Sequence, residues 1–145
     1  MLPVLNESGD LPPGIHVAGW TEIQERFGQG SVIRARAMSR LRHLHELATR
    51  AVALRRCYVF GSFVTSVPEP RDIDIVLLMS ADFRVEDCPR ESRTLFSHAE
   101  AQARHGASVF WLREEMLPDA SMREFLNTWQ LKRDGSKRGI VEIQP

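Results

Sequence analysis

The chain has 145 residues, of which 43% are hydrophobic and 26% are charged. This length and composition fit a single globular domain with its own core and leave little room for a second domain. The 19 basic side chains balance 19 acidic ones. That balance excludes a strong overall attraction to nucleic acid or membranes and leaves a local charged patch open.

Only two cysteines are present, Cys57 and Cys88, and they do not form a CxxC spacing. Two such residues argue against a disulfide scaffold and against a structural zinc site. The first seven residues lack the basic region and apolar stretch of a secretion signal, and no apolar run is as long as a membrane span. We therefore expect a cytoplasmic protein with reduced thiols and no membrane partner.

The N-terminal segment, residues 1–19, is rich in proline and glycine. Proline removes a hydrogen-bond donor and disfavours helix in the residue before it, so an extended arm is expected here. A short helix is expected next, because Thr21 and Gln24 fit a capping box and Gly28 follows at its end.

A longer amphipathic helix is expected from Ser31, which can cap its start, to about Arg55. Apolar residues repeat in it at steps of three or four, which is typical of a helix that packs one face against a sheet. The members of this stripe are Ile33, Ala37, Leu41, Leu44, Ala48 and Val52. The arginines that fall mostly outside the stripe are Arg34, Arg36, Arg40, Arg42 and Arg50.

Strands and helices alternate through the rest of the chain. Residues 73–79 form a nearly unbroken apolar run, which is typical of a strand buried on both faces. Further strands are expected at 57–60, 108–112 and 140–143, helices at 91–105 and 121–131, and a turn at Asp134-Gly135. This pattern predicts an α/β layered domain whose last strand is a candidate for an exposed edge.

The first candidate site residues follow the strand at 57–60. Gly61 has no Cβ, so the backbone there can approach a ligand closely. Ser62 adds a hydroxyl and an amide, and backbone donors in such a turn can cradle phosphate oxygens. Thr65 can extend this phosphate-binding turn or simply cap the loop. A Gly-Ser pair after a strand is by itself usually only a turn.

Two carboxylates open the next buried strand. Asp72 and Asp74 are two residues apart, so on a strand their side chains point to the same face with Cα atoms roughly 6.5–7 Å apart. Carboxylates at that separation can converge on one hard cation, and magnesium suits a site that supplies few carboxylates and leaves room for water and phosphate. Acids on a buried strand are costly unless something compensates their charge. The alternative is a solvated strand end or a helix cap.

Gly61-Ser62, a loop, and then Asp72-Ile73-Asp74 resemble the signature of the polymerase-beta-like nucleotidyltransferase superfamily. The stretches 11–16, 61–65 and 133–141 are similar to a bacterial subgroup of the minimal nucleotidyltransferases, so the resemblance spans almost the whole chain. It implies an α+β domain in which helices pack a mixed β-sheet.

The resemblance also implies a chemistry. Gly61 and Ser62 would bind the triphosphate of a nucleotide, with ATP as the family default, and Asp72 and Asp74 would be the catalytic ligands of Mg²⁺ or Mn²⁺. The ions neutralise the phosphates and align an acceptor hydroxyl for in-line attack on the α-phosphorus, and pyrophosphate leaves. The acceptor stays open among a protein side chain, a tRNA end and a small molecule.

The superfamily normally adds a third carboxylate from a later strand. The strand expected at 108–112 contains no acid, and Ser108 stands where the aspartate is expected, while Glu114 and Glu115 come just after, too far along to face the metals. Two hypotheses follow. The first is an active transferase with Glu114 or Glu115 as a substitute. The second is a domain that binds a nucleotide or a protein partner without turnover, such as the antitoxin of a toxin–antitoxin pair.

Other polar residues have two interpretations each. Arg71 can contact a phosphate or pair with the two aspartates. The basic stretch from Trp129 to Arg138 can contact a polynucleotide, or Trp129 can belong to the core while the rest forms a solvated turn. The histidines lack ligand spacing and are expected to be structural or exposed: His16, His43, His45, His98 and His105.

Overall fold

A computed structural model describes residues 1–116 and 119–144 of the chain. Five strands form one sheet in the order β1-β5-β2-β3-β4. The strands are Ile15–Ala18 (β1), Leu54–Phe60 (β2), Ile73–Met79 (β3), Ala107–Arg113 (β4) and Ile140–Ile143 (β5). Pairs β1/β5 and β3/β4 are parallel, and β2 is antiparallel to both β3 and β5. The expected α/β class is confirmed, and the sheet is mixed.

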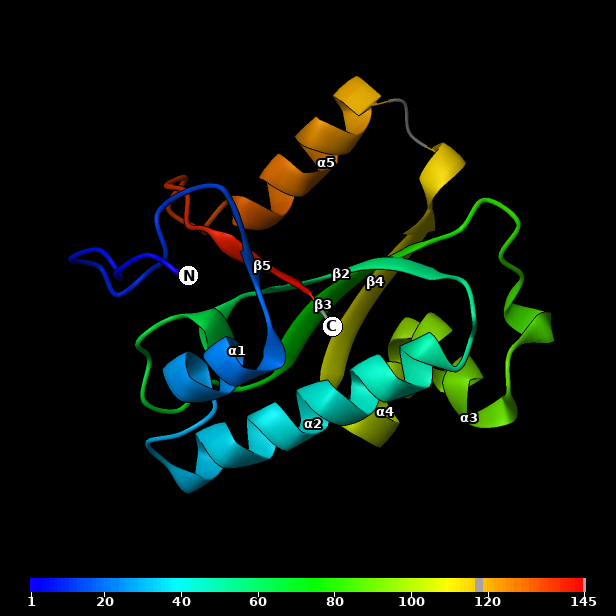
Figure 1. Cartoon of the computed structure of the whole chain (residues 1–145), viewed down its shortest axis with the longest axis horizontal. Helices are drawn as coiled ribbons and strands as arrows, with labels where there is room; N and C mark the ends of the chain where they lie inside the picture. The colour runs from blue at the N-terminus through cyan, green and yellow to red at the C-terminus, as the bar shows by residue number, and fades with distance from the viewer. Residues whose placement is uncertain (117–118, 145) are drawn as a thin grey trace.

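Helices cover both faces of this sheet (Figure 1). They are Trp20–Phe27 (α1), Val32–Thr49 (α2), Arg90–Arg93 (α3), His98–His105 (α4) and Asp119–Gln130 (α5). The larger core cluster joins α1, α2 and α4 to one face, and a smaller cluster joins α5 to the other. Within the described residues, no helix is both long and apolar enough to cross a membrane.

Strand β3 explains how the two cores share one sheet. Ile73, Ile75 and Leu77 lie in the larger cluster, and the alternating Val76 and Leu78 lie in the smaller one. Because successive side chains of a strand point to opposite faces, a strand between two cores must be apolar throughout. The sequence-based bounds of this strand and its burial on both faces are confirmed.

The N-terminal segment packs against the domain. Leu2 and Leu11 are buried, and Arg26 of α1 donates to the carbonyl oxygens of Leu2 (3.0 Å) and Pro3 (2.8 Å). Residues 15–18 of the expected arm pair with β5 as strand β1. Strand β5 therefore lies between β1 and β2, and the expectation that it forms an exposed edge is wrong.

The start of α1 and the end of α2 differ from the sequence-based expectation. Helix α1 begins at Trp20 after Gly19, so Thr21 lies inside the helix and does not cap it. Helix α2 is capped by Ser31 as expected, since the Ser31 side chain accepts from the amide of Arg34. It ends at Thr49 because the chain turns there, with Val52 in a left-handed conformation (φ 59°) and 91% exposed.

The helix expected at 91–105 is divided. Residues 94–96 form a tight 3-10 turn, and the side chain of Ser97 then caps α4 by accepting from the amide of Glu100 (3.4 Å). Aromatic packing holds this break in place, because the centroid of the Phe96 ring lies 4.7 Å from that of Phe83 and 5.4 Å from that of Trp111. A serine inside a helical pattern can thus start a new helix when neighbouring rings fix the turn before it.

Arg34 is a buried cation inside α2, with 7% of its surface exposed. Its Nη1 donates to the carbonyl oxygens of Phe27 (3.1 Å) and Phe63 (2.9 Å). Its Nη2 donates to the carbonyl oxygens of Thr65 (2.6 Å) and Val67. Three of these acceptors belong to the loop after β2, so one guanidinium holds that loop against the helix.

Replacing this guanidinium is expected to destabilise the domain. Arg34→Met leaves buried carbonyls without donors and is expected to lower the free energy of unfolding by about 3 kcal/mol or more in denaturant titrations. Arg34→Lys keeps the charge without the planar fork and is expected to be intermediate. Arg36→Met, on the exposed surface of the same helix, is the control and is expected to change stability by less than about 0.5 kcal/mol. Equal stability of Arg34→Met and the control would contradict this role.

Candidate functional site

The chain bends sharply at Gly61, directly after β2. Its backbone has φ 78° and ψ −161°, a conformation that favours glycine. A Cβ at this position would lie 2.2 Å from Oδ2 of Asp74. The glycine thus allows the bend and the Asp74 carboxylate to touch, which is the juxtaposition on which the sequence-based site depends.

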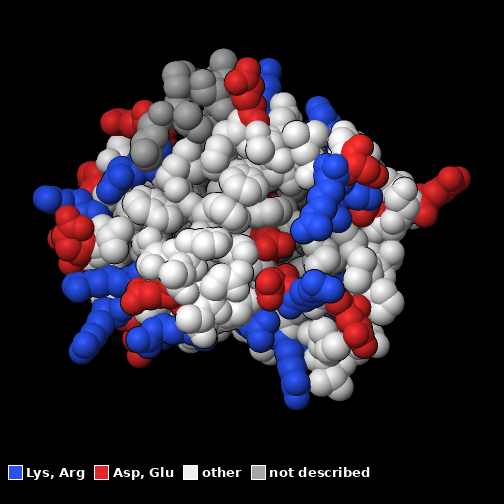
Figure 2. Space-filling model, turned by 180° about the vertical axis from the view of Figure 1, so that it is seen from behind, with Lys and Arg blue, Asp and Glu red and all other residues white. Residues whose placement is uncertain are grey.

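Strand pairing brings the two acids to this bend. The β2/β3 register pairs Phe60 with Asp74, so the residues just after β2 lie next to those just before β3. Asp74 is half-buried and Asp72 is exposed. Asp74 belongs to the face of β3 that carries Val76, which is the face covered by α5. Figure 2 shows the side of the molecule opposite α2, where a broad uncharged area borders acidic and basic side chains.

The carboxyl of Asp74 is held in an unfavourable environment for its charge. Burial, followed by the negative charge of Asp72, raises its pKa from an ordinary 3.8 to about 6. A hydrogen bond from Ser108 and the positive charge of Arg138 act in the opposite direction. The two carboxylates are therefore close enough to repel each other, and the charge nearby compensates them only in part.

Basic residues of the C-terminal segment approach the same site. Lys132 Nζ lies 2.8 Å and Arg138 Nη1 lies 3.8 Å from the carboxylate oxygens of Asp10, which is 4% exposed. Asp10 in turn forms a β-bridge with Thr65 in the loop after Gly61. Arg138 is thus fixed near both Asp10 and Asp74. Sequence reasoning placed it in a basic tail, because the partner that fixes it lies more than a hundred residues away.

The remaining sequence-predicted residues have distinct surroundings. Ser62 is half-buried and begins the 3-10 turn Ser62–Val64. The hydroxyl of Thr65 donates to the carbonyl of Ser62 (2.7 Å) and accepts from the amide of Val67 (3.2 Å), so it caps the loop. Arg71 is exposed, and among the described residues no salt bridge joins it to Asp72 or Asp74.

Strand β4 places a serine beside Asp74. The β3/β4 register pairs Asp74 with Ser108, whose side chain hydrogen-bonds to the carboxylate. Gln102 of α4 donates to the Ser108 hydroxyl (3.0 Å). The position at which the superfamily resemblance leads one to expect a third carboxylate therefore carries a neutral hydroxyl.

Glu114 lies at the other end of β4. It follows Arg113, which pairs with the last residue of β3, so it is about 20 Å along the sheet from Ser108. Its carboxylate is 3.7 Å from Arg55. Glu115 is its neighbour in the chain. The hypothesis that Glu114 or Glu115 substitutes for the third carboxylate is therefore wrong, because a parallel pair of strands carries both residues away from the site.

The residues present suit a hydrated hard cation. Among the residues whose side chains the structure describes, no group of three or more His, Cys, Asp and Glu is arranged to hold a metal ion. Mg²⁺ needs fewer protein ligands, because it keeps several waters and is completed by substrate phosphates. Asp72 and Asp74 offer two repelling carboxylates beside a glycine that keeps the adjacent space free of a Cβ. This donor set fits Mg²⁺ or Mn²⁺.

Stability is expected to depend on pH through Asp74. Its folded-state pKa lies above the unfolded value, so the protonated acid favours folding and the free energy of unfolding falls as pH rises from about 4 through 6. Asp74→Asn is expected to remove this cost and to be more stable than the parent by about 1–2 kcal/mol near pH 7.5, after allowance for solvent screening. Thermal unfolding at several pH values measures the difference. Exposed Asp87→Asn is the control, and a loss of stability in Asp74→Asn at neutral pH would contradict the expectation.

Comparison with known proteins gives one family match. No curated protein and no solved structure matches the chain. Residues 3–144 match a family of unknown function, DUF6932. Because this match covers nearly the whole chain, the protein belongs to the DUF6932 family.

Proposed function

We propose that this protein binds a magnesium–nucleoside triphosphate at Gly61, Ser62, Asp72 and Asp74 and transfers the nucleoside monophosphate to a hydroxyl acceptor. The proposal is carried by one observation, the contact between the Gly61 bend and the Asp74 carboxylate. A bend that can receive phosphate and an acid pair that can receive a divalent cation lie side by side, as a metal–triphosphate complex requires.

The acid pair would hold the metal. Asp72 is exposed and free to turn toward a ligand, while Asp74 is fixed by strand pairing and by the Ser108 hydrogen bond. Bound there, Mg²⁺ would supply charge neutralisation at the phosphates and orient the attacking hydroxyl. The mutual repulsion of the two carboxylates favours any cation that binds between them, so the free protein is organised for this ligand.

The bend and the neighbouring cation would hold the phosphates. Ser62 begins a helical turn, and the first amides of such a turn have no acceptor within it. Arg138 adds positive charge beside Asp74 on a side chain anchored by Asp10. In the transfer the acceptor oxygen forms a bond to the α-phosphorus, and the bond from that phosphorus to the pyrophosphate oxygen breaks. ATP is the default nucleotide, and a protein, an RNA or a small molecule is the acceptor class.

A second candidate function follows from Ser108. The hydroxyl beside Asp74 cannot accept a proton from an attacking alcohol as a third carboxylate does, and loss of a general base costs about 10²–10⁴ in rate. The chain would then bind the magnesium–nucleotide without turnover and act through a protein partner, such as the toxin of a toxin–antitoxin pair. The same residues hold the nucleotide in both candidates.

Nucleotide binding tests both candidates together. Magnesium–ATP is expected to bind the parent protein in titration calorimetry, and Asp72→Ala with Asp74→Ala is expected to abolish binding, because the cation loses both of its protein ligands. Asp87→Ala is the matched control and is expected to bind as the parent does, since this exposed acid lies outside the site. Circular dichroism checks that each variant is folded. Undiminished binding by the folded double variant excludes this site.

A transfer assay separates the two candidates. The parent protein is incubated with each α-labelled nucleoside triphosphate, Mg²⁺ or Mn²⁺, and a cell lysate, and label is sought in protein and RNA. Label that appears with the parent and disappears with the double variant supports the transferase. If no nucleotide gives label while calorimetry still shows binding, the protein binds without turnover.

A further inference from the structure

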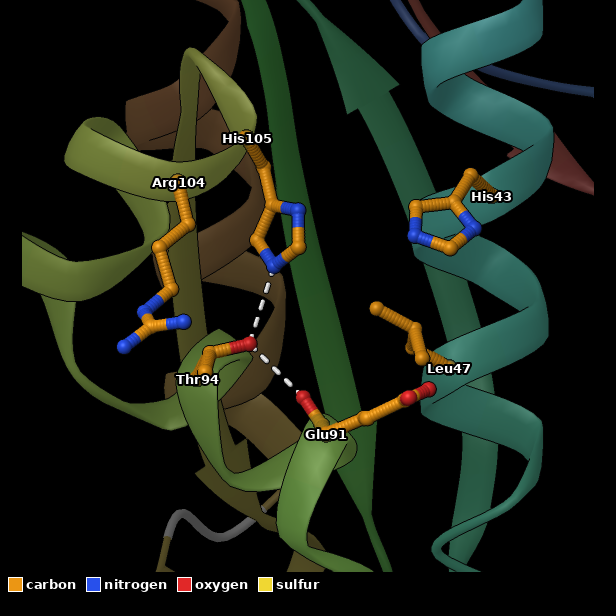
Figure 3. A pocket seen from close by; sticks show the side chains of 6 residues that line it. All are labelled: His43, Leu47, Glu91, Thr94, Arg104 and His105. Atoms are coloured by element: carbon orange, nitrogen blue, oxygen red, sulfur yellow. Dashed lines mark hydrogen bonds between the residues drawn. The ribbon is translucent and has the colours of Figure 1, made fainter.

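A pocket lined by both polar and apolar side chains lies on the face of the sheet that α2 and α4 cover, opposite the face that carries Asp74. It has a volume of about 530 Å³ and opens between α2 and the segment from α3 to α4 (Figure 3). Its walls are formed by His43, Leu47, Glu91, Thr94, Arg104 and His105. A volume of this order suits a small molecule and not an extended polymer. None of these residues belongs to the proposed nucleotide site.

Two histidines face each other across the pocket. The ring of His43 on α2 and that of His105 at the end of α4 have centroids 5.8 Å apart, and Figure 3 shows a nitrogen of each ring turned toward the other. Both come from helices whose backbones are fixed in the larger core. Two basic groups are therefore held at opposite walls of one cavity.

The hydrogen bonds of Thr94 fix which nitrogen of His105 is free. The Thr94 hydroxyl donates its single proton to the carbonyl of Glu91 (2.7 Å), so it must accept from His105 Nε2 (2.9 Å). The proton of a neutral His105 ring then lies on Nε2, and Nδ1 is the nitrogen left for a ligand. When Nδ1 is protonated, it becomes a donor directed toward His43.

The charges around the pocket favour an anion. Arg104 lines it from α4, and Arg50, the residue that follows α2, pairs with the carboxylate of Glu91 at 3.4 Å. Burial lowers the pKa of His105 because it disfavours the charged imidazole. The neighbouring His43 and Arg104 lower it further, because another positive charge beside them is repelled. A metal cation does not fit, since Arg104 repels it and the described residues offer no set of three ligands.

We propose that this pocket binds the phosphate group of a small phosphomonoester, with His43 and His105 contacting its oxygens and Arg104 turning toward it as a third cationic group. Arg104 is exposed, and in Figure 3 its guanidinium lies beside Thr94 on the side away from His43, so this contact forms on binding. A phosphomonoester carries close to two negative charges at neutral pH, which matches one guanidinium and one imidazolium. Leu47 provides an apolar wall for the ester's organic part, and Glu91 lies where it can accept from a hydroxyl or amino group of the ligand.

Binding is coupled to the histidines and therefore to pH. An anion stabilises the protonated imidazole, so it raises the low pKa of His105 and binds more tightly as pH falls. The groups around this ring are His43 from α2, Glu91 from α3 with its ion-pair partner Arg50, Thr94, and Arg104 from α4. Sulfate is the appropriate first probe, because its charge stays constant while the protonation of His105 changes.

The experiment measures anion affinity of the full chain by titration calorimetry and by the NMR shifts of the histidine rings. Sulfate is expected to bind about tenfold more tightly near pH 5.5 than near pH 8, with shifts in His43 and His105 but not in His16. Arg104→Gln is expected to weaken binding at least tenfold, and His105→Gln to remove most of the pH dependence. The controls are Arg36→Gln and His98→Gln, which lie outside the pocket and are expected to bind as the parent does.

Further binding measurements identify the class of molecule that carries the phosphate. Glycerol 3-phosphate is expected to bind at least tenfold more tightly than inorganic phosphate, because only the ester uses the apolar wall. A short RNA without a terminal phosphate and vesicles of phosphatidylglycerol are expected not to compete. Tighter binding of RNA or vesicles overturns the small-ligand assignment. Absence of binding by every probe at about 10 mM, or equal binding by folded Arg104→Gln, overturns the site.

Discussion

The clamp that Arg34 places on the loop after β2 is the interaction on which the candidate site depends. The loop after β2 leaves the sheet at Gly61, and strand hydrogen bonds no longer hold its backbone there. The Arg34 guanidinium holds it by donating to three carbonyls of that loop and to the carbonyl of Phe27 at the end of α1. Burying a cation is costly unless its donors are satisfied, and here the backbone satisfies them. Strand pairing sets Asp74 opposite Phe60, and this arrangement holds the loop that follows Gly61 beside it.

The electrostatics of the site differ from those of a closed structural ion pair. Asp10 is matched by Lys132 and Arg138 and is almost wholly buried, as a structural acid should be. Asp74 has only a hydroxyl and a more distant positive charge, and its pKa rises to about 6. The contrast between the two acids in one region indicates that the fold can compensate a buried carboxylate where needed. At Asp74 the compensation is only partial, which is the pattern that the proposed cation site requires.

Local patterns in the sequence predicted a large part of this structure. The apolar run 73–79, the Ser31 cap and the Gly-Ser and Asp-x-Asp positions are encoded within a few residues each, so they could be read directly. The contacts of Arg34 and Arg138 could not, because a cation on a helix or a turn has the same local pattern whether its partner is water or a distant carbonyl. The break of the helix expected at 91–105 depends on aromatic packing from two other segments.

The hydrogen bonds that link Gln102, Ser108 and Asp74 limit which residue can stand at position 108. A single substitution, Ser108→Asp, would place a further acid beside Asp74. It would also set a third negative charge against two carboxylates that already repel each other, and it would remove the hydroxyl to which Gln102 of α4 donates. Such a variant would carry more uncompensated negative charge than the parent protein at neutral pH. The serine thus limits the charge that the fold has to bury at this edge of the sheet, and an acid at position 108 would need new counter-charges elsewhere in the domain.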